Sequence, residues 1–169
     1  TLFWIKENLT RTFPDVAFTI ADEKLPLRDK LLNEKRKQYH SHMILSEVQG
    51  YAVRKTCLNR VLGVVDADIF VPELNFVFGE ATCVGKAALI SLWRLKPEFY
   101  GDTPNVSLFL ERALKEAVHE LGHTLGLGHC PRSSCVMHFS KTISDTDIKQ
   151  SLFCCKCYLH VKMSINVLG

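Results

Sequence analysis

The sequence has no long apolar run, no internal repeat and no low-complexity segment. Its most apolar stretch, residues 87–93, is far shorter than the roughly 20 residues that a membrane-spanning helix needs, so we expect a soluble protein with no membrane partner. The chain has 169 residues, of which 47% are hydrophobic. That is enough to bury one core without disulfides, which excludes a disordered chain and predicts a single domain over residues 1–169.

Excess charge is also scarce. Lysine and arginine number 21 against 18 aspartates and glutamates, a net charge of +3. The one dense basic cluster, residues 35–37, follows Glu34 and is typical of a solvated loop. Because nucleic-acid-binding domains concentrate much more positive charge on one face, we expect no nucleic-acid partner.

The seven cysteines are unevenly distributed along the chain. Cys57 and Cys83 stand alone, and we expect both to be buried structural thiols. The other five crowd residues 130–157 and include a C-x-x-C pair at residues 154–157. An odd count with such a pair is typical of metal-bound thiolates in a reducing compartment rather than of secreted disulfides. We therefore expect a cytoplasmic protein.

Hydrophobic periodicity predicts a mixed α/β (α+β) fold. Four helices are expected, which begin at residue 2, at Ser41, near Pro104 and near Ser144. Ser41 could cap the second of these helices, and Asp102 or Thr103 could cap the third. Strands are expected at residues 16–20, 61–65, 69–71, 75–80 and 86–95. The last two strands are expected to form a hairpin that turns near Gly85, and residues 24–38 are expected to be a loop.

The helix that follows Pro104 carries the main functional signature. Its apolar residues recur with a period of 3.6 on about one third of the circumference, whereas His119 and His123, four residues apart, lie side by side on the opposite face. Together with Glu120 and His129 they form H-E-x-x-H-x-x-G-x-x-H. Chance gives this pattern in roughly 4 of every hundred thousand chains of this composition, so it predicts a zinc site.

His129 is the third ligand that we expect. In a continuous helix it would lie about 15 Å beyond His119 along the axis, whereas three imidazoles must all reach one zinc ion at about 2.0–2.1 Å. Gly126 can adopt the left-handed conformation that ends helices, so the chain can turn back there. No glutamate follows the motif. Asp145 and Asp147 are the other candidate ligands, but they fit better in the first turn of a short helix.

Three neutral histidines leave a fourth position on zinc for a water molecule, whose pKa falls to about 7. Glu120 points about 100° away from His119 around the helix, so it is placed to face that water. We expect Glu120 to act as general base and then to carry the proton to the leaving amine. The motif thus predicts a zinc-dependent metallopeptidase with peptide or protein substrates.

The residues resemble those of the metzincin metallopeptidases, which share the elongated motif and a later methionine turn, here Cys135-Val136-Met137. The cysteine pattern after His129, with the segments 75–80 and 115–118, is similar more specifically to the archaemetzincins, a family of archaea and vertebrates. The resemblance covers most of the chain. It implies a metzincin-like fold with a twisted mixed sheet, an active-site helix and Met137 packed beneath the three histidines.

The same resemblance implies a second, structural zinc ion, and hence two zinc ions per chain. Its four thiolate ligands would be Cys130, Cys135, Cys154 and Cys157. Such a closed site would fasten the short C-terminal segment to the catalytic turn. We therefore expect an upper sheet subdomain, about residues 1–126, and a lower, zinc-clamped subdomain, about residues 127–169. Cys155 is an alternative to Cys154, although the spacing favours Cys154. Because Cys130 adjoins His129, we expect the two sites to be mechanically coupled.

The resemblance also implies an exposed edge strand, around residues 76–80 or 86–92, that binds extended peptides through main-chain hydrogen bonds. Some metzincins have an assisting tyrosine two positions after the methionine. Phe139 stands there and has no hydroxyl, so either another group assists or turnover is slow. Two other functions stay open: a catalytically weak or silent metzincin-like protein that binds peptides or proteins, and a nucleic-acid finger, which the low charge disfavours. We expect a monomer.

Overall fold

The structure, a computed structural model, describes residues 1–13, 15–55 and 57–168, with side chains up to residue 166. Its α-helices are α1 (Leu2–Thr12), α2 (Ser41–Arg54), α3 (Val106–Thr124), α4 (Ile143–Ile148) and α5 (Cys155–Leu168). Its strands are β1 (Leu32–Asn33), β2 (Gln38–His40), β3 (Val61–Val65), β4 (Ile69–Phe70), β5 (Gly79–Ala81) and β6 (Ala87–Ser91). Short 3-10 helices cover Asp29–Leu31, Trp93–Leu95 and Pro97–Tyr100. No described helix has both the length and the apolarity to pass through a membrane.

The strands form two small mixed sheets, and the mixed α/β fold is thereby confirmed. In the sheet next to the site, the central strand β6 runs parallel to β3 and antiparallel to β5, with Leu89 opposite Glu80. In the second sheet, β2 lies between an antiparallel β1 and a parallel β4. Among the described strands β5 pairs only with β6, so it is an edge strand.

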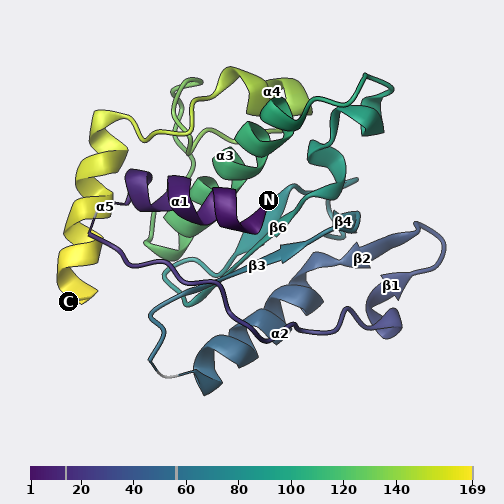
Figure 1. Ribbon diagram of the computed structural model, residues 1–169, viewed down its shortest axis with the longest axis horizontal. Coiled ribbons are helices and arrows are strands. Elements are labelled where there is room, and N and C mark those ends of the chain that lie inside the picture. The colour runs from purple at the N-terminus through teal and green to yellow at the C-terminus, as the bar shows by residue number, and fades with distance from the viewer. Residues whose placement is uncertain (14, 56, 169) are drawn as a thin grey trace.

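Helices α2 and α3 cover opposite faces of the β3-β6-β5 sheet, and α1 packs against α3 (Figure 1). Every residue of β6 is buried between these two layers. Because successive side chains of a strand point to opposite faces, Ala88 and Ile90 join the core beneath α3, whereas Ala87 and Leu89 join the core beneath α2. The sheet therefore gives α3 a rigid apolar support.

Several expected elements are present. The helix at the start of the chain is α1, the helix near Ser144 is α4, and β5 and β6 form the expected hairpin. The expected strand at residues 16–20 is wrong: Val16 and Phe18 pack at the edge of the core, but the segment pairs with no strand in the part of the chain that the structure describes. The strand expected at residues 75–80 begins only at Gly79.

The N-termini of two helices also differ from expectation. Asn105, not Asp102 or Thr103, caps α3, because its side chain accepts a hydrogen bond of 3.0 Å from the Leu108 amide. Ser41 is the first residue of α2 rather than its cap, and its hydroxyl donates to Glu80 on the neighbouring strand. A side chain that can cap its own helix has instead bonded to a partner from another element.

The expected loop at residues 24–38 also contains structure. It includes the 3-10 helix at Asp29–Leu31, strand β1 and the first residue of β2, which pairs with β1. Strands this short leave too few residues for an alternating pattern to be read from the sequence.

Candidate active site and metal centres

Helix α3 brings the first two histidines together. Its apolar face, including Ala113, Ala117 and Val118, is fully buried against the sheet and α1. His119 and His123 share the other face, as their spacing requires, and their ring centroids lie 4.6 Å apart.

The chain turns back immediately after α3. Gly126 has φ +91°, a conformation that only glycine adopts without strain, and the Leu127 amide donates to the Gly122 carbonyl at 3.1 Å. The free carbonyls of the last turn are also satisfied by other parts of the chain. Arg60 donates to the Thr124 carbonyl at 3.2 Å, and two amides of the β5–β6 turn donate to the carbonyls of residues 123 and 124. The expected turn at Gly126 is thus present.

As a result, the rings of all three histidines converge. The His129 ring lies 4.9 Å from that of His123 and 5.3 Å from that of His119, measured between centroids. One nitrogen of each ring lies within 4.8 Å of the corresponding nitrogens of the other two. His119 is buried, whereas His129 lies at the surface, so this group of side chains, which we call the histidine cluster, opens toward solvent at His129.

Hydrogen bonds fix how two of these rings face the centre of the cluster. His119 Nδ1 donates to the Val136 carbonyl and His123 Nδ1 donates to the Leu127 carbonyl, both at 2.7 Å. A carbonyl only accepts, so each Nδ1 carries the proton and each Nε2 is left with a bare lone pair. These two Nε2 atoms face each other at 3.1 Å, a repulsive arrangement that a cation between them relieves.

The electrostatics of the histidine cluster suit a metal ion rather than a proton. Burial lowers the pKa of His119 well below its ordinary value and also lowers the pKa values of His123 and His129. The rings are therefore neutral near pH 7, the form that coordinates a metal. Neutral imidazoles with their second nitrogen bonded to a carbonyl are the usual donors to zinc, so the residues present fit that ion.

Glu120 lies beside the cluster, buried against β5. Burial raises the pKa of its carboxyl group well above the ordinary value, and the nearby Glu116 carboxylate raises it further. The Lys149 ammonium acts in the opposite direction and lowers this pKa. A carboxyl group held in this way is suited to accept and release a proton near neutral pH.

The methionine turn lies against the active-site helix, next to His119 and Gly122. Met137 is fully buried, and its sulfur packs against Gly122 in the middle of the motif. The Cys130 amide donates to the Met137 carbonyl at 2.8 Å, and His138 Nδ1 donates to the Cys130 carbonyl at 3.0 Å. The turn is therefore tied to the segment that carries His129. The Phe139 ring packs on His129, with its centroid 4.8 Å away, and brings no hydroxyl to the site.

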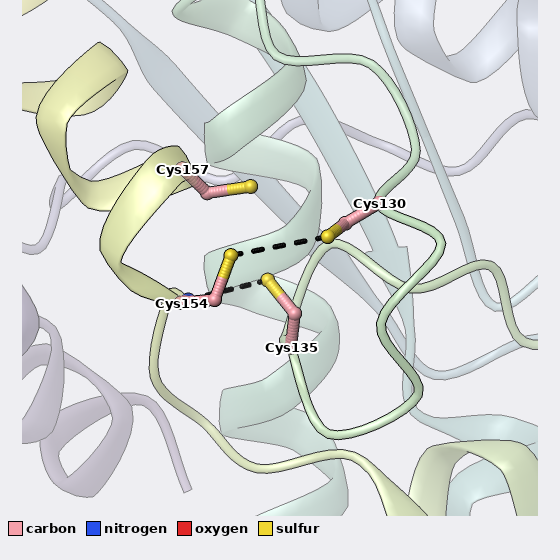
Figure 2. Close-up of side chains that lie close together, drawn as sticks. All are labelled: Cys130, Cys135, Cys154 and Cys157. Carbon is pink, nitrogen blue, oxygen red and sulfur yellow. Dashed lines mark hydrogen bonds between the residues drawn. The ribbon is translucent and has the colours of Figure 1, made fainter.

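Four thiols form a second cluster, which we call the cysteine cluster, between the start of α5 and the loop that carries Cys130 and Cys135 (Figure 2). Its members, whose sulfur atoms all lie within 4.8 Å of one another, are Cys130, Cys135, Cys154 and Cys157. Cys154 Sγ lies 3.9 Å from Cys130 Sγ, and the Cys154 amide donates to Cys135 Sγ at 3.4 Å. Cys155 points to solvent and lies outside the cluster.

The thiols of the cysteine cluster differ in acidity. A hydrogen bond from the Cys157 backbone lowers the pKa of Cys154 to about 7, whereas burial raises the pKa values of Cys135 and Cys157. Four converging thiols that form no disulfide match the donor set of a closed tetrahedral zinc site.

The lone cysteines and the two aspartates are also placed by the structure. Cys57 and Cys83 are exposed, so the expectation of buried thiols is wrong: both lie in turns near the surface, not in the core. Asp145 lies in the first turn of α4, in a capping box with Thr142. Asp147 pairs with Arg112 of α3 through two contacts of 2.7 Å, and neither carboxylate joins the histidine cluster.

One buried ion pair near the site was not predicted from the sequence. Lys149 Nζ lies 2.9 Å from Glu116 Oε1, with side-chain exposures of 0% and 3%. The ammonium is not aligned for a hydrogen bond within the described residues, whereas Thr146 Oγ1 donates to the same Glu116 oxygen at 3.0 Å. The sequence feature that could have indicated this pair is the position of Glu116, four residues before Glu120 and hence on the same face of the helix. A carboxylate buried there requires a cation as its partner.

An active-site helix with three converging histidines, a neighbouring glutamate and a methionine turn below them is the arrangement of metzincin-type metallopeptidases. Comparison with known proteins agrees with this class. The chain belongs to peptidase family M54, whose model matches residues 14–163.

The relatives within this family are archaemetzincins. The archaemetzincin of Methanocaldococcus jannaschii is 51% identical over 125 residues, which are 74% of this chain and 66% of the relative. Across four such archaeal relatives, the matched part spans 50–69% of the relative's own length.

Two solved structures have the same fold as this chain. The crystal structure of archaemetzincin from Methanopyrus kandleri superimposes with a TM-score of 0.85 and 34% identity, and covers 98% of this chain and 86% of its own. A zinc-dependent peptidase from Methanocorpusculum labreanum gives a TM-score of 0.84 and 28% identity, with 93% and 91% covered.

Proposed function

We propose that this protein is a zinc-dependent metallopeptidase that hydrolyses peptide bonds. The observation that carries the proposal is the pair of bare Nε2 lone pairs, on His119 and His123, that face each other at 3.1 Å beside the carboxyl group of Glu120. Membership in a peptidase family supports it.

His119, His123 and His129 would hold the catalytic zinc. Zinc bound there supplies a Lewis acid that polarises the scissile carbonyl and lowers the pKa of a water molecule. The chain's own contribution begins with the Val136 and Leu127 carbonyls, which hold two of the rings in the coordinating tautomer. Such outer hydrogen bonds orient ligands and raise their basicity.

Glu120 would move the proton. Its carboxylate accepts a proton from the attacking water and then, as a carboxylic acid, donates it to the leaving amine nitrogen. The raised pKa of Glu120, caused chiefly by burial, suits both halves of this transfer. Phe139 offers no hydroxyl to the oxyanion, so we expect slow turnover.

The substrate would be an extended peptide beside β5. This strand has one free edge among the described residues, and such an edge binds a peptide by strand addition, largely independent of the peptide's side chains. Gly79 and Glu80 of β5 lie at the Glu120 end of this edge, which would place a bound peptide next to the base.

Substitution of Glu120 tests the reaction. We expect Glu120→Ala to abolish cleavage of a fluorogenic peptide library while the zinc content, measured by mass spectrometry, stays unchanged. Cleavage by Glu120→Ala at the wild-type rate would refute the role of the base. The alternative is a catalytically silent protein that binds peptides, and the lack of a hydroxyl at Phe139 is the observation in its favour. A zinc-loaded wild type that binds peptides but cleaves none would support this alternative.

We further propose two zinc ions per chain, the second held by the four thiols of the cysteine cluster. The wild type would then contain two equivalents of zinc, and His129→Ala and Cys154→Ala would each contain about one. Cys155→Ala is the matched control and would keep both ions, because Cys155 points to solvent. Full zinc content in Cys154→Ala together with loss in Cys155→Ala would reverse the assignment.

The setting of the protein follows from the same features. The chain would comprise an upper sheet subdomain, about residues 1–126, and a lower subdomain, about residues 127–169, that the cysteine cluster clamps. The thiols of this cluster persist only in a reducing compartment such as the cytoplasm. A monomer with peptide substrates, without nucleic acid or membrane partners, fits the modest net charge of +3. Light scattering of the zinc-loaded protein checks the monomer, and a dimer would overturn it.

A further inference from the structure

The side chain of Glu120 lies flat against the backbone of β5 at Gly79. A β-carbon at position 79 would lie 2.6 Å from both Cγ and Oε1 of Glu120, and 2.7 Å from the Leu89 carbonyl oxygen. Real β-carbons essentially never lie within 3.0 Å of a heavy atom outside their own residue and its two chain neighbours. Residue 79 must therefore be glycine for Glu120 to occupy this place.

Space, not backbone conformation, selects this glycine. The glycines with positive φ are Gly101 and Gly126 among the described residues, and Gly79 is not one of them. Any residue can adopt the backbone of Gly79, so what its missing side chain provides is room for another group. Two groups fill that room: the Glu120 side chain and the β6 backbone at Leu89.

Packing rather than hydrogen bonding holds the Glu120 carboxylate. Two neighbouring carboxylates are anchored by hydroxyl donors: Thr146 donates to Glu116, and Ser41 donates to Glu80. Within the described residues, no side chain donates to Glu120 in this way. The position of the carboxylate therefore depends on the residues that pack around it, and on the side of the sheet that residue is Gly79.

We propose that Gly79 is a positioning residue that sets where the Glu120 carboxylate lies relative to the histidine cluster. The inference rests on the proposed peptidase function. It also links two parts of that function, because one short strand supplies both the edge for the substrate and the support for the base. Base and bound peptide would thus be aligned through the same backbone.

Kinetics of Gly79→Ala test the positioning role. Because displacement of a reacting group by about 1 Å can cost about 100-fold in rate, we expect kcat to fall roughly 10- to 100-fold while KM changes little and the zinc content stays at the wild-type value. Gly50→Ala in α2 is the matched control, since a β-carbon there meets only Arg54 Nη1 at 3.5 Å. We expect wild-type kcat from the control. Unchanged kcat in Gly79→Ala would overturn the inference.

A second measurement does not depend on activity. The shift of the urea midpoint caused by Gly79→Ala is compared in the wild type and in Glu120→Ala, both zinc-loaded. The contact with the Leu89 carbonyl is present in both backgrounds, whereas the contact with Glu120 exists only in the first. We expect a clearly smaller shift in the Glu120→Ala background, and equal shifts would overturn the inference.

The two measurements together also cover a failure to fold. If Gly79→Ala does not fold but Gly79→Ala/Glu120→Ala does, the contact between the two residues is supported. If neither folds, the approach of the Leu89 backbone dominates, Gly79 is only structural, and the inference is overturned. Full activity of Glu120→Ala would refute the proposed function, yet the midpoint comparison would still report whether residues 79 and 120 are in contact.

Discussion

The buried ion pair between Lys149 and Glu116 gives the sharpest prediction of stability. Its side chains are 0% and 3% exposed, and the ammonium and carboxylate lie 2.9 Å apart. Replacement of Lys149 by methionine, which fills a similar volume, leaves the Glu116 charge buried. Among the described residues, the hydroxyl of Thr146 is then its only hydrogen-bond partner. An uncompensated buried charge is far more costly than the pair itself is favourable.

We expect Lys149→Met to lower the free energy of unfolding by about 3–5 kcal/mol, the range for breaking a buried pair from one side. This is a large share of the roughly 5–15 kcal/mol that stabilises a domain. At about 2–4 °C per kcal/mol for a chain of this size, Tm falls by roughly 6–20 °C. Urea denaturation and calorimetry of the zinc-loaded protein measure both values.

A surface pair provides the control. Lys96 Nζ lies 2.6 Å from Asp66 Oδ1, but the two side chains are 33% and 53% exposed, so Lys96→Met should cost no more than about 1 kcal/mol. Adding Glu116→Gln to Lys149→Met removes the buried charge and should recover much of the loss. The reasoning is refuted if Lys149→Met costs no more than Lys96→Met, or if Glu116→Gln recovers nothing.

Three further predictions concern the surroundings of the site. Gly126→Ala should lower the free energy of unfolding by about 1–2 kcal/mol, because a φ of +91° is strained for alanine. The variant should also lose zinc to a chelator more readily than the wild type. Unchanged zinc retention would contradict the role of the turn. Asp147→Asn should lower stability by about 1–3 kcal/mol, since Arg112 loses a charged partner, and an unchanged urea midpoint would oppose this. Hydrogen bonds from the Thr142 backbone lower the pKa of Asp145 in the folded state. The ionised Asp145 therefore stabilises the fold at pH values above its pKa in the unfolded chain, and this stabilisation is lost as the pH falls through its pKa in the folded protein. Asp145→Asn should therefore destabilise more at pH 7 than at pH 3, and equal effects in pH-dependent denaturation would count against the capping box.

Features governed by local geometry were readable from the sequence. A helix places residues four apart on one face whatever surrounds it, so the juxtaposition of His119 and His123 followed from spacing alone. The turn at Gly126 followed because one residue type tolerates that backbone. The hairpin of β5 and β6 and the crowding of cysteines after residue 130 were local signals of the same kind.

Features that depend on distant partners were not readable. The segment at residues 16–20 has strand-like residues but pairs with none of the described strands, and Ser41 has its hydrogen-bond acceptor on another element. The exposure of Cys57 and Cys83 contradicts a general preference of cysteine for the core. Helix α5 was not expected, although Val161 is buried in the main core.

The two clusters depend on the same short stretch of chain, residues 130–136. Cys130 follows His129 directly, as the sequence already indicated. The structure adds a second link: Cys135 belongs to the cysteine cluster, and the next residue, Val136, accepts the hydrogen bond that orients His119. The Val136 amide in turn donates to the Leu152 carbonyl at 3.0 Å, two residues before Cys154. The His119 ring is thus oriented by, and His129 directly precedes, a segment that carries two of the four thiols.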